Sequence, residues 1–542
     1  MGNYSSKQRR PATGRSPVHS TNPTRTHEAG IGWARDAKSE LFLTAVSTMI
    51  GEGNAYESGD ARLDRMRELV MDVTAQDPAW LAGFIPWLRS EAQIRTGSVV
   101  LAAETARAMY IHRRNRVTPA SSISVRKLVD AACQRADEPA EMLAYWRSTY
   151  GRVLPDGLQR GVADAASRLY TERAALRWDG TDRAWRMGDV LAVAHPTPKD
   201  PQQAALFRCL IDRRYGRAEG DYGLGMLSAR ADLDTIPPVE RRAWLASGPH
   251  AAGGVRRAGH DWRSLATWLQ GPLDATAWEA ILPGLGYMAI LRNLRNLDEA
   301  GVSDQAVEVV AAKIMDAGEV KASRQFPLRY LSAMREARSL RWSWPLERAL
   351  QLSLNNVPEL SGRTLVMVDT SGSMEGQMSD RSGLRRRDAA VIFGLAVAQR
   401  CRQVDVVSFS APRLPGQLGS IVFPMLQGES LLTAVKRWDS RYHIGGATRT
   451  ADALQRHYYG HDRVIVVTDE QYHGADPSTA LSPDVPMYTW NVAGHRAGGK
   501  AGRNRHTFGG LTDASFRMVL LLEAGRDAAW PWVGTDQAPE HR

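Results

Sequence analysis

Cysteine is scarce in this chain of 542 residues, which has only Cys133, Cys209 and Cys401. The three are odd in number and far apart in the sequence. This usage argues against a disulfide framework and against a cysteine-based zinc site. It is typical of a protein kept in a reducing compartment, so we expect a cytoplasmic location.

Long apolar runs are also missing. No stretch of about 18 apolar residues occurs, so we expect no membrane-spanning helix. Residues 1–27 are rich in Ser, Thr, Pro and Arg and have scarcely any large apolar side chain. Such a segment cannot bury enough surface to offset its ordering entropy, so we predict a disordered basic tail over residues 1–27.

The excess of positive charge is modest. The chain has 69 Lys and Arg against 59 Asp and Glu, a formal net charge of +10. No polybasic tract accounts for this excess. Binding to nucleic acid would therefore need a local basic patch on the folded protein.

Apolar residues recur at three- and four-residue spacing from residue 28 to about residue 357, which is the period of amphipathic helices. Short breaks with Gly, Pro or Asp separate the segments. Examples are Glu40–Ile50, Ala61–Val73, Ala79–Ser90, Val99–His112, Val125–Ala132, Pro201–Tyr215, Gly286–Leu297, Ser303–Met315 and Trp344–Leu354. Helix pairs over more than 300 residues predict an α-solenoid rather than one bundle.

The pattern changes after Pro358. Short apolar runs that read as strands now alternate with helical segments, and several runs are apolar on both faces. The strands expected are Thr364–Val368, Val404–Phe409, Val464–Val467 and Met487–Asn491, with helices at Asp388–Gln399, Leu431–Trp438 and Thr450–Tyr458. Residues 358–542 are therefore predicted to form a doubly wound α/β domain with a mainly parallel sheet.

Side chains with oxygen atoms occur directly after two of these strands and in one loop. Asp369, Ser371 and Ser373 form a D-x-S-x-S turn directly after the first strand. Thr448 ends a Gly-Gly-Ala-Thr loop, and Asp469 follows the run ending at Val467. In such sheets, ligands bind outside the carboxyl ends of the strands. The five side chains are therefore predicted to converge.

Two carboxylates and three hydroxyls make a site for a hard divalent cation. Mg²⁺ is the expected ion, with Mn²⁺ or Ca²⁺ as alternatives, and a water or a further ligand would complete the coordination. Either carboxylate could act through water. The competing interpretation is that these residues simply cap turns, since Asp, Ser, Thr and Gly are common there.

The order of the three elements resembles the metal-ion-dependent adhesion site of von Willebrand factor A domains, over roughly the last 180 residues. The matching segments are DTSGSM, GGAT and VVTD. The resemblance implies that an acidic side chain of a protein partner occupies the open coordination position.

Four further segments resemble the TROVE-module family, which includes the Ro ribonucleoprotein autoantigen and bacterial relatives. They are Gly30–Tyr56, Gly188–Pro198, Gly286–Leu294 and Phe326–Arg335. The resemblance implies a monomeric ring of HEAT-like helical repeats over residues 28–357, followed by the A domain. It also implies binding of small noncoding Y-type RNA and of single-stranded ends of misfolded RNA. An exoribonuclease partner and a role in RNA quality control, without catalysis, are implied as well.

His195 falls at the histidine that this family associates with RNA contact. The basic residues that the family carries upstream are not reproduced at the same spacing, because Trp178–Ala184 looks inserted or rearranged. Arginines are the other candidates, since guanidinium groups pair with phosphates and stack on bases. They are Arg177, Arg183, Arg186, Arg113, Arg114 and Arg292. Each arginine cluster could equally be a solvated helix face.

Two other functions are compatible with parts of the sequence. A hydrolase built on Ser371 or Ser373 lacks a G-x-S-x-G elbow and a positioned base. His457 and His461 have i, i+4 spacing but lack the glutamate of an H-E-x-x-H zinc site. We therefore predict that the chain is not an enzyme. A protein-recognition scaffold without RNA remains the alternative, because solenoids bind proteins as readily as RNA.

Overall fold

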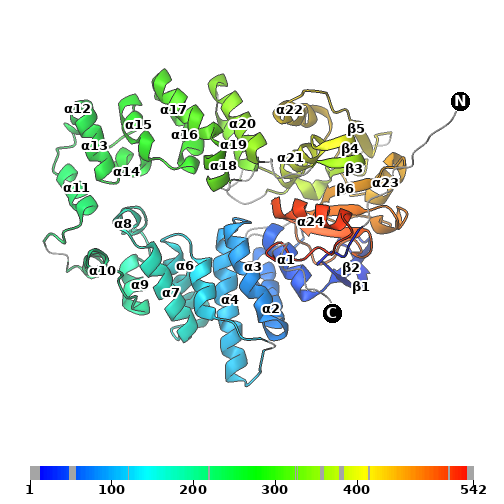
Figure 1. Ribbon diagram of the computed structural model, residues 1–542, viewed down its shortest axis with the longest axis horizontal. Helices are drawn as coiled ribbons and strands as arrows, with labels where there is room; N and C mark the ends of the chain where they lie inside the picture. Colours follow the sequence, from blue (N-terminus) through cyan, green and yellow to red (C-terminus); the bar gives the residue numbers. More distant parts are fainter. Residues whose placement is uncertain are drawn as a thin grey trace. The chain divides into compact units, whose positions relative to one another are not determined.

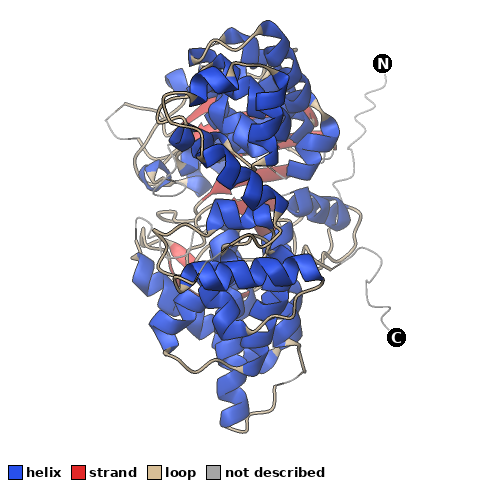
Figure 2. Cartoon of the chain, turned by 90° about the vertical axis from the view of Figure 1, so that its left-hand side faces the viewer, coloured by secondary structure: helices blue, strands red, loops and turns tan. Residues whose placement is uncertain are grey.

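The structure is a computed structural model. It describes residues 13–47, 56–119, 121–217, 220–323, 325, 327–337, 339–353, 359–377, 384–412, 416–510 and 513–533. Helices account for most of the described chain, and the strands are few (Figure 2).

The chain divides into two compact units. One, called here the sheet unit, comprises Met1–Gly97, Phe326–Ser332 and Ser353–Arg542. The other, the helical unit, comprises Ser98–Gln325 and Ala333–Leu352. The predicted boundary near residue 357 therefore misplaces the first helices. These helices pack with the C-terminal domain, which periodicity cannot reveal because it reports one helix face and not its partner.

The helical unit consists of short helices with brief connections (Figure 1). They are α4 (Arg95–Arg114), α5 (Val125–Ala132), α6 (Glu138–Tyr150), α7 (Asp156–Leu169), α8 (Glu172–Trp178), α9 (Met187–Ala194), α10 (Pro201–Arg214), α11 (Gly225–Asp234), α12 (Arg241–Leu245), α13 (Pro249–Arg257), α14 (Trp262–Trp268), α15 (Ala275–Ile281), α16 (Tyr287–Glu299), α17 (Asp304–Met315), α18 (Ala317–Ser323) and α20 (Ser343–Ser353). Helix α19 (Pro327–Glu336) is divided between the units.

Local sequence accounts for many of these helix ends. Helix α10 begins after Asp200, whose carboxylate accepts a hydrogen bond from the Gln203 amide at 2.7 Å, and Pro201 occupies the first turn. Such caps satisfy amides that have no partner within the helix. Between α5 and α7, a Cβ on Gly161 would lie 2.6 Å from Cβ of Val129. The glycine therefore permits the close approach of this helix pair.

The sheet unit is built around six strands in the order β5-β4-β3-β6-β7-β8. All neighbours are parallel except β4 and β5. The strands are β3 (Leu360–Asp369), β4 (Cys401–Phe409), β5 (Ser420–Phe423), β6 (Arg463–Thr468), β7 (Met487–Asn491) and β8 (Arg505–Gly509). The helices of this domain are α21 (Arg386–Ala398), α22 (Leu431–Arg441), α23 (Thr450–His457) and α24 (Asp513–Glu523).

Helices cover both faces of this sheet. On one face, Gly394 of α21 lies so close to β3 that a Cβ would be 2.6 Å from Val368. On the other face, Leu365 and Val466 pack with Leu454 of α23 in one buried cluster. The doubly wound sheet predicted from the sequence is therefore present. Strands β5 and β8 were missed, because their short runs contain charged or polar residues.

The N-terminal segment contradicts the predicted disordered tail over residues 13–27. Ser20–Arg25 forms β1, which pairs antiparallel with β2 (Ile31–Arg35), and Val18 is buried. The Thr26 hydroxyl donates to the carbonyl of Tyr472 at 2.7 Å, far along the chain. Tertiary pairing thus orders a segment whose own composition disfavours order. Residues 1–12 lie outside the described residues.

Three helices, α1 (Ala37–Ser47), α2 (Gly59–Gln76) and α3 (Pro78–Ser90), complete the sheet unit. Phe84 of α3 packs against Trp532 with ring centroids 5.0 Å apart. A Cβ on Gly83 would lie 2.5 Å from the Trp532 ring. The C-terminal segment therefore packs directly on the N-terminal helices. Among the described residues, no helix is long and apolar enough to cross a bilayer.

Candidate functional site

The strand order places a crossover between β3 and β6. From β3 the chain passes to β4 and β5, and it then returns to β6 on the other side of β3. Ligands of doubly wound sheets bind at such a point, beyond the carboxyl ends of the strands. Asp369 is the last residue of β3, and Asp469 directly follows β6. Both carboxylates lie at the crossover.

Backbone hydrogen bonds join the three predicted loops. The amide of Gly372 donates to the carbonyl of Gly446 at 2.8 Å, and Gly445 donates to Thr370 at 3.0 Å. The amide of His473 donates to the carbonyl of Thr448 at 2.8 Å. Gly445 and Gly446 have φ of 72° and 98°, a left-handed conformation that favours glycine. The loops carrying all five predicted ligands therefore lie together.

Four of the five predicted ligands, Asp369, Ser371, Thr448 and Asp469, are buried, and Ser373 is half-buried. Asp369 Oδ1 accepts from the amide of Ser371 at 2.8 Å, and Oδ2 accepts from the Thr468 hydroxyl at 2.5 Å. The hydroxyls of Ser371 and Ser373 are 3.2 Å apart. Oδ2 of Asp469 is buried and accepts no hydrogen bond, with His495 Nε2 at 3.8 Å. A buried carboxylate oxygen that accepts no hydrogen bond has the properties of a cation ligand.

The two carboxylates are electrostatically coupled. Burial and the charge of Asp469 raise the pKa of Asp369 to about 7. Burial alone would also raise the pKa of Asp469, but His495 and the Ser373 hydroxyl hold it below its usual range. Two like charges buried side by side are unfavourable unless a positive charge joins them. The donor set of carboxylates and hydroxyls suits Mg²⁺.

Nitrogen and sulfur ligands do not contribute an obvious alternative. Across the described ranges, no group of three or more His, Cys, Asp or Glu could hold a metal ion. The two histidines with i, i+4 spacing contact other side chains: His461 Nε2 lies 2.7 Å from Asp405, and His457 Nε2 lies 2.8 Å from the Ser420 hydroxyl.

An N-terminal turn that the sequence analysis missed contacts this site. The His27 amide donates to the side chain of Gln471 at 2.8 Å. The Tyr56 hydroxyl donates to Glu28 at 2.7 Å, and the Tyr56 ring stacks on His27 at 4.7 Å. Burial, Glu28 and Asp469 raise the pKa of Tyr56. No local spacing signals this contact, because its residues lie more than 400 positions from Asp469.

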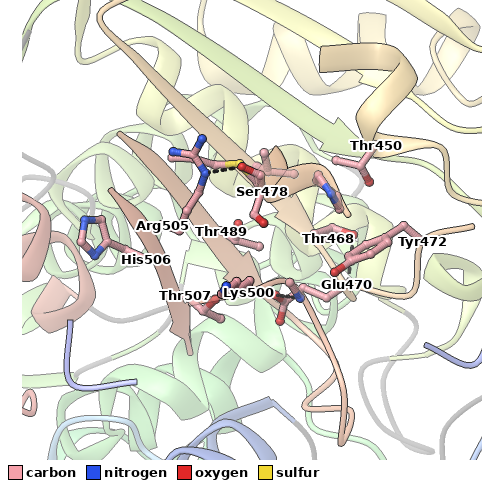
Figure 3. A pocket seen from close by; sticks show the side chains of 14 residues that line it. Thr450, Thr468, Glu470, Tyr472, Ser478, Thr489, Lys500, Arg505, His506 and Thr507 are labelled. Carbon is pink, nitrogen blue, oxygen red and sulfur yellow. Dashed lines mark hydrogen bonds between the residues drawn. The ribbon is translucent and has the colours of Figure 1, made fainter. Parts of the chain in front are cut away.

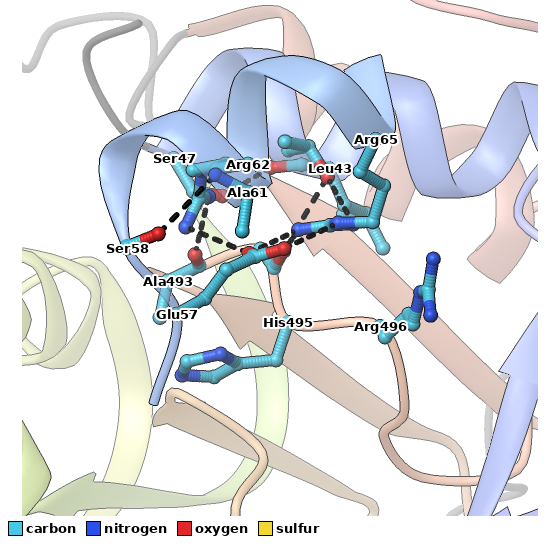
Figure 4. A network of polar contacts seen from close by, with 12 residues as sticks. Leu43, Ser47, Glu57, Ser58, Ala61, Arg62, Arg65, Ala493, His495 and Arg496 are labelled. Carbon is cyan, nitrogen blue, oxygen red and sulfur yellow. Dashed lines mark hydrogen bonds and ion pairs between the residues drawn. The ribbon is translucent and has the colours of Figure 1, made fainter. Parts of the chain in front are cut away.

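Two arginines of α2, Arg62 and Arg65, lie beside the loop after β7 (Figure 4). Arg62 donates to the carbonyl of Ala493 at 2.8 Å. Both nitrogens of Arg65 that face Glu57 donate to it, at 2.9 and 2.7 Å, and Arg65 also reaches Glu40 at 2.8 Å. The helix is thus fastened to the loop after β7.

A small cavity under β6, β7 and β8 offers no room for an organic ligand (Figure 3). Its volume of about 20 Å³ corresponds to a single water molecule. Arg505 on its wall donates to the carbonyl of Ser478 at 2.8 Å, and Glu470 accepts from the Gly499 amide at 3.1 Å. Its polar groups therefore hold the loops together.

The arginines predicted to bind RNA lie in the helical unit, and their surroundings differ from one arginine to the next. Trp178 has three guanidinium groups around its ring, those of Arg135, Arg177 and Arg183, at 4.3, 4.9 and 5.4 Å from the ring centroid. Arg177 is exposed, while Arg183 also lies 3.9 Å from Asp137. This basic group surrounds the segment that looked rearranged in the sequence.

Arg186 and His195 stand at the two ends of α9. Arg186 is buried and pairs with Asp179 at 2.8 Å, and Asp179 also accepts from the Met187 amide. His195 is exposed and ends the helix in the left-handed conformation, with φ of 52°. Arg186 thus has a structural role at the helix start, whereas the His195 ring is free of the core.

The other three predicted arginines are Arg113, Arg114 and Arg292. They are exposed on α4 and α16. None of the contacts found among the described residues links them to the Trp178 group.

Known proteins resemble this chain in both sequence and fold. The model of the TROVE domain matches residues 270–343. A Deinococcus radiodurans protein named RNA-binding protein RO60 is 26% identical over 264 residues, which cover 44% of this chain and 46% of that protein. The match therefore spans less than half of this curated relative. The resemblance to the TROVE-module family is confirmed.

The crystal structure of the Deinococcus radiodurans RO (RSR) protein has the same fold. It superposes with a TM-score of 0.58 at 17% identity, covering 90% of this chain and all of that one. The predicted fold class, helical repeats followed by a doubly wound domain, is confirmed.

Proposed function

Because the chain carries a TROVE match and shares the fold of the Deinococcus Ro protein, we propose that it is an RNA-binding protein of the Ro type and not an enzyme. The observation that carries the proposal is its similarity to a protein named as RNA-binding. Its ligands would be small noncoding Y-type RNA and single-stranded ends of misfolded RNA. Its role would be in RNA quality control in the cytoplasm, with an exoribonuclease as a partner.

The surroundings of Trp178 support contact with single-stranded RNA. Guanidinium groups of Arg177 and Arg183 can pair with phosphates, and planar groups can stack on unpaired bases. His195 adds an exposed ring on the neighbouring helix. Phosphate-dominated binding depends steeply on salt, which provides the test.

The experiment is native purification followed by sequencing of the bound RNA, together with titration of a labelled unstructured RNA at several salt concentrations. We expect co-purified RNA and an affinity that falls linearly in log salt. A chain that carries no RNA and binds none at low salt would contradict the proposal. It would favour the protein-recognition scaffold instead.

We further propose that Asp369, Ser371, Ser373, Thr448 and Asp469 hold a divalent cation, Mg²⁺ in the first instance. When bound, the ion would neutralise the paired carboxylates and present an open position to an acidic side chain of a protein partner. The orphaned oxygen of Asp469 supports this assignment. The hydrogen bonds between the loops would hold these five ligands in position around the ion.

Thermal melting tests the cation. Binding to the folded state at a hundred times Kd stabilises it by about 2.7 kcal/mol, so Mg²⁺ should raise the melting temperature. Asp369→Ala should abolish this rise. Asp452→Ala, which removes an exposed carboxylate of α23, serves as the matched control. An equal Mg²⁺ response in Asp369→Ala and wild type would refute the assignment.

A further inference from the structure

A second, larger cavity of the sheet unit lies between the start of β5 and helix α23. Its volume is about 180 Å³, against about 20 Å³ for the cavity described above. Cavities that enclose a whole small-molecule ligand have about 300–1,000 Å³, so this one has room for a single side chain. It is called here the β5 pocket, and its lining includes Ser410, Pro412, Leu418, Ser420, Arg449 and Arg456.

The β5 pocket shares a loop with the proposed cation site. Ser410 follows the carboxyl end of β4, and its hydroxyl lies 2.6 and 3.0 Å from the carbonyls of Gly445 and Ala447. These carbonyls belong to the Gly-Gly-Ala-Thr loop that ends in Thr448. Arg449 of the pocket wall directly follows Thr448 in the sequence. A ligand at the cation would therefore have the pocket beside it.

Two arginines give the pocket a positive charge. Arg456 is exposed, and its Nη1 donates to the Ser420 hydroxyl at 3.3 Å. Among the described residues, Arg456 has no ion pair. Arg449 is exposed as well, and its pair with Asp452 is 3.3 Å long and open to solvent. Because a guanidinium has five donors, most of those of Arg456 are available to an acidic ligand.

The wall opposite these charges is partly apolar. Leu418 is 62% exposed, and Pro412 is exposed beside it in the pocket lining. A side chain with a short hydrocarbon stem and a terminal carboxylate matches both parts of the pocket. The stem would cover Leu418 and Pro412, and the carboxylate would accept hydrogen bonds from a guanidinium. Glutamate has this structure.

We propose that the β5 pocket binds a second acidic side chain of the protein partner whose first carboxylate completes the coordination of the cation. The partner then presents an exposed segment with two acidic residues close together in sequence. The inference rests on the cation site and the acidic partner proposed above. Two contacts on one segment strengthen each other, because the second forms within the same complex. The pocket thereby selects among acidic partners, which a cation alone does not distinguish.

The test is the binding of labelled peptides to the full chain in Mg²⁺, followed by fluorescence anisotropy at low ionic strength, where exposed charges are least screened. One probe is a glycine-rich peptide with a single glutamate. The others carry a second glutamate one, two or three residues further along. At least one of these should bind about three- to fivefold more tightly, as expected for a partly exposed charge pair.

Arg456→Met should remove this gain and leave the affinity for the single-glutamate peptide unchanged. Arg402→Met is the matched control, because Arg402 is exposed near the start of β4, at the opposite end of that strand from Ser410. It removes the same charge and should keep the gain. Arg449→Met tests the other guanidinium, should Arg456→Met fold poorly.

Four results would overturn the pocket assignment while the cation assignment stands. They are no gain from a second glutamate at any spacing, a gain that survives in both Arg456→Met and Arg449→Met, an equal loss in Arg402→Met, and weaker RNA binding in Arg456→Met with peptide binding intact. The last would assign the pocket to phosphates of RNA. If no peptide binds in Mg²⁺, the acidic partner at the cation and the pocket are refuted together.

Discussion

A buried arginine of the sheet unit and two exposed arginines of the helical unit have different surroundings. In the sheet unit, Arg463 is buried and donates to Glu523 and to the Thr364 hydroxyl. In the helical unit, Arg113 and Arg292 are exposed and have no ion pair among the described residues. Arg463 therefore fastens buried strands, whereas Arg113 and Arg292 are accessible to a ligand. The number of arginines in a sequence therefore says little about function until it is known which of them are buried.

The largest effect is expected at Arg463. In Arg463→Ala, the mostly buried carboxylate of Glu523 would lose its partner, which costs about 3 kcal/mol of unfolding free energy. Arg113→Ala should change stability by less than about 0.5 kcal/mol, as is usual for exposed positions. Chemical denaturation of both variants measures the contrast. Equal losses would remove the distinction between the two units.

A comparable effect should separate two arginines within the helical unit. Arg186→Ala breaks a buried pair with Asp179 and should cost about 3 kcal/mol. Arg183 is partly exposed, so Arg183→Ala should have little effect on stability. It should mainly weaken RNA binding, by roughly tenfold if the contact is a charged hydrogen bond. Denaturation and RNA titration at matched salt check both. An RNA defect in a fully folded Arg186→Ala, with none in Arg183→Ala, would reverse the assignment.

A pH effect is expected at His260 of the helical unit. Burial and Arg230 lower its pKa from 6.5 to about 3, so the folded state keeps this ring neutral. As the pH falls below 6.5 the unfolded chain takes up a proton that the folded chain does not. Stability should then drop by up to about 1.4 kcal/mol per pH unit. His260→Gln should show a shallower loss between pH 7 and 5, and parallel curves would contradict this.

The smallest effect concerns His195, which has φ of 52°. His195→Gly should stabilise the helical unit by about 0.5 kcal/mol, because glycine adopts this conformation without strain. The same change should weaken RNA binding if the ring contacts RNA. Unchanged affinity in a stabilised variant would assign the histidine to helix termination alone.

The sequence predicted that the loops carrying Asp369, Thr448 and Asp469 lie together. Asp369 and Asp469 each follow a recognisable strand, and the carboxyl ends of parallel strands share one edge of the sheet. The helices could be predicted as well, because the apolar period of a helix is a local property of the sequence. The von Willebrand factor A resemblance added the order of the elements.

The rest depends on contacts that no local pattern records. Strand β1 is polar, and it is ordered by its pairing with β2 and by the hydrogen bond from Thr26 to the carbonyl of Tyr472. Arg62 and Arg386 look like ordinary surface arginines of amphipathic helices, and only their burial sets them apart. Arg186 looked like a ligand for RNA in the sequence, but Asp179 lies at hydrogen-bonding distance.

The packing of Trp532 against Phe84 has a consequence for how the protein is made. More than 400 residues separate Phe84 from Trp532 in the sequence. A ribosome adds about 5–20 residues per second, so Trp532 is synthesised well after Phe84. Helices α1 to α3 must therefore wait, with aromatic surface uncovered, until the last segment emerges. The helical unit, whose contacts are closer in sequence, can fold in the meantime, so chaperone demand should concentrate on the N-terminal helices.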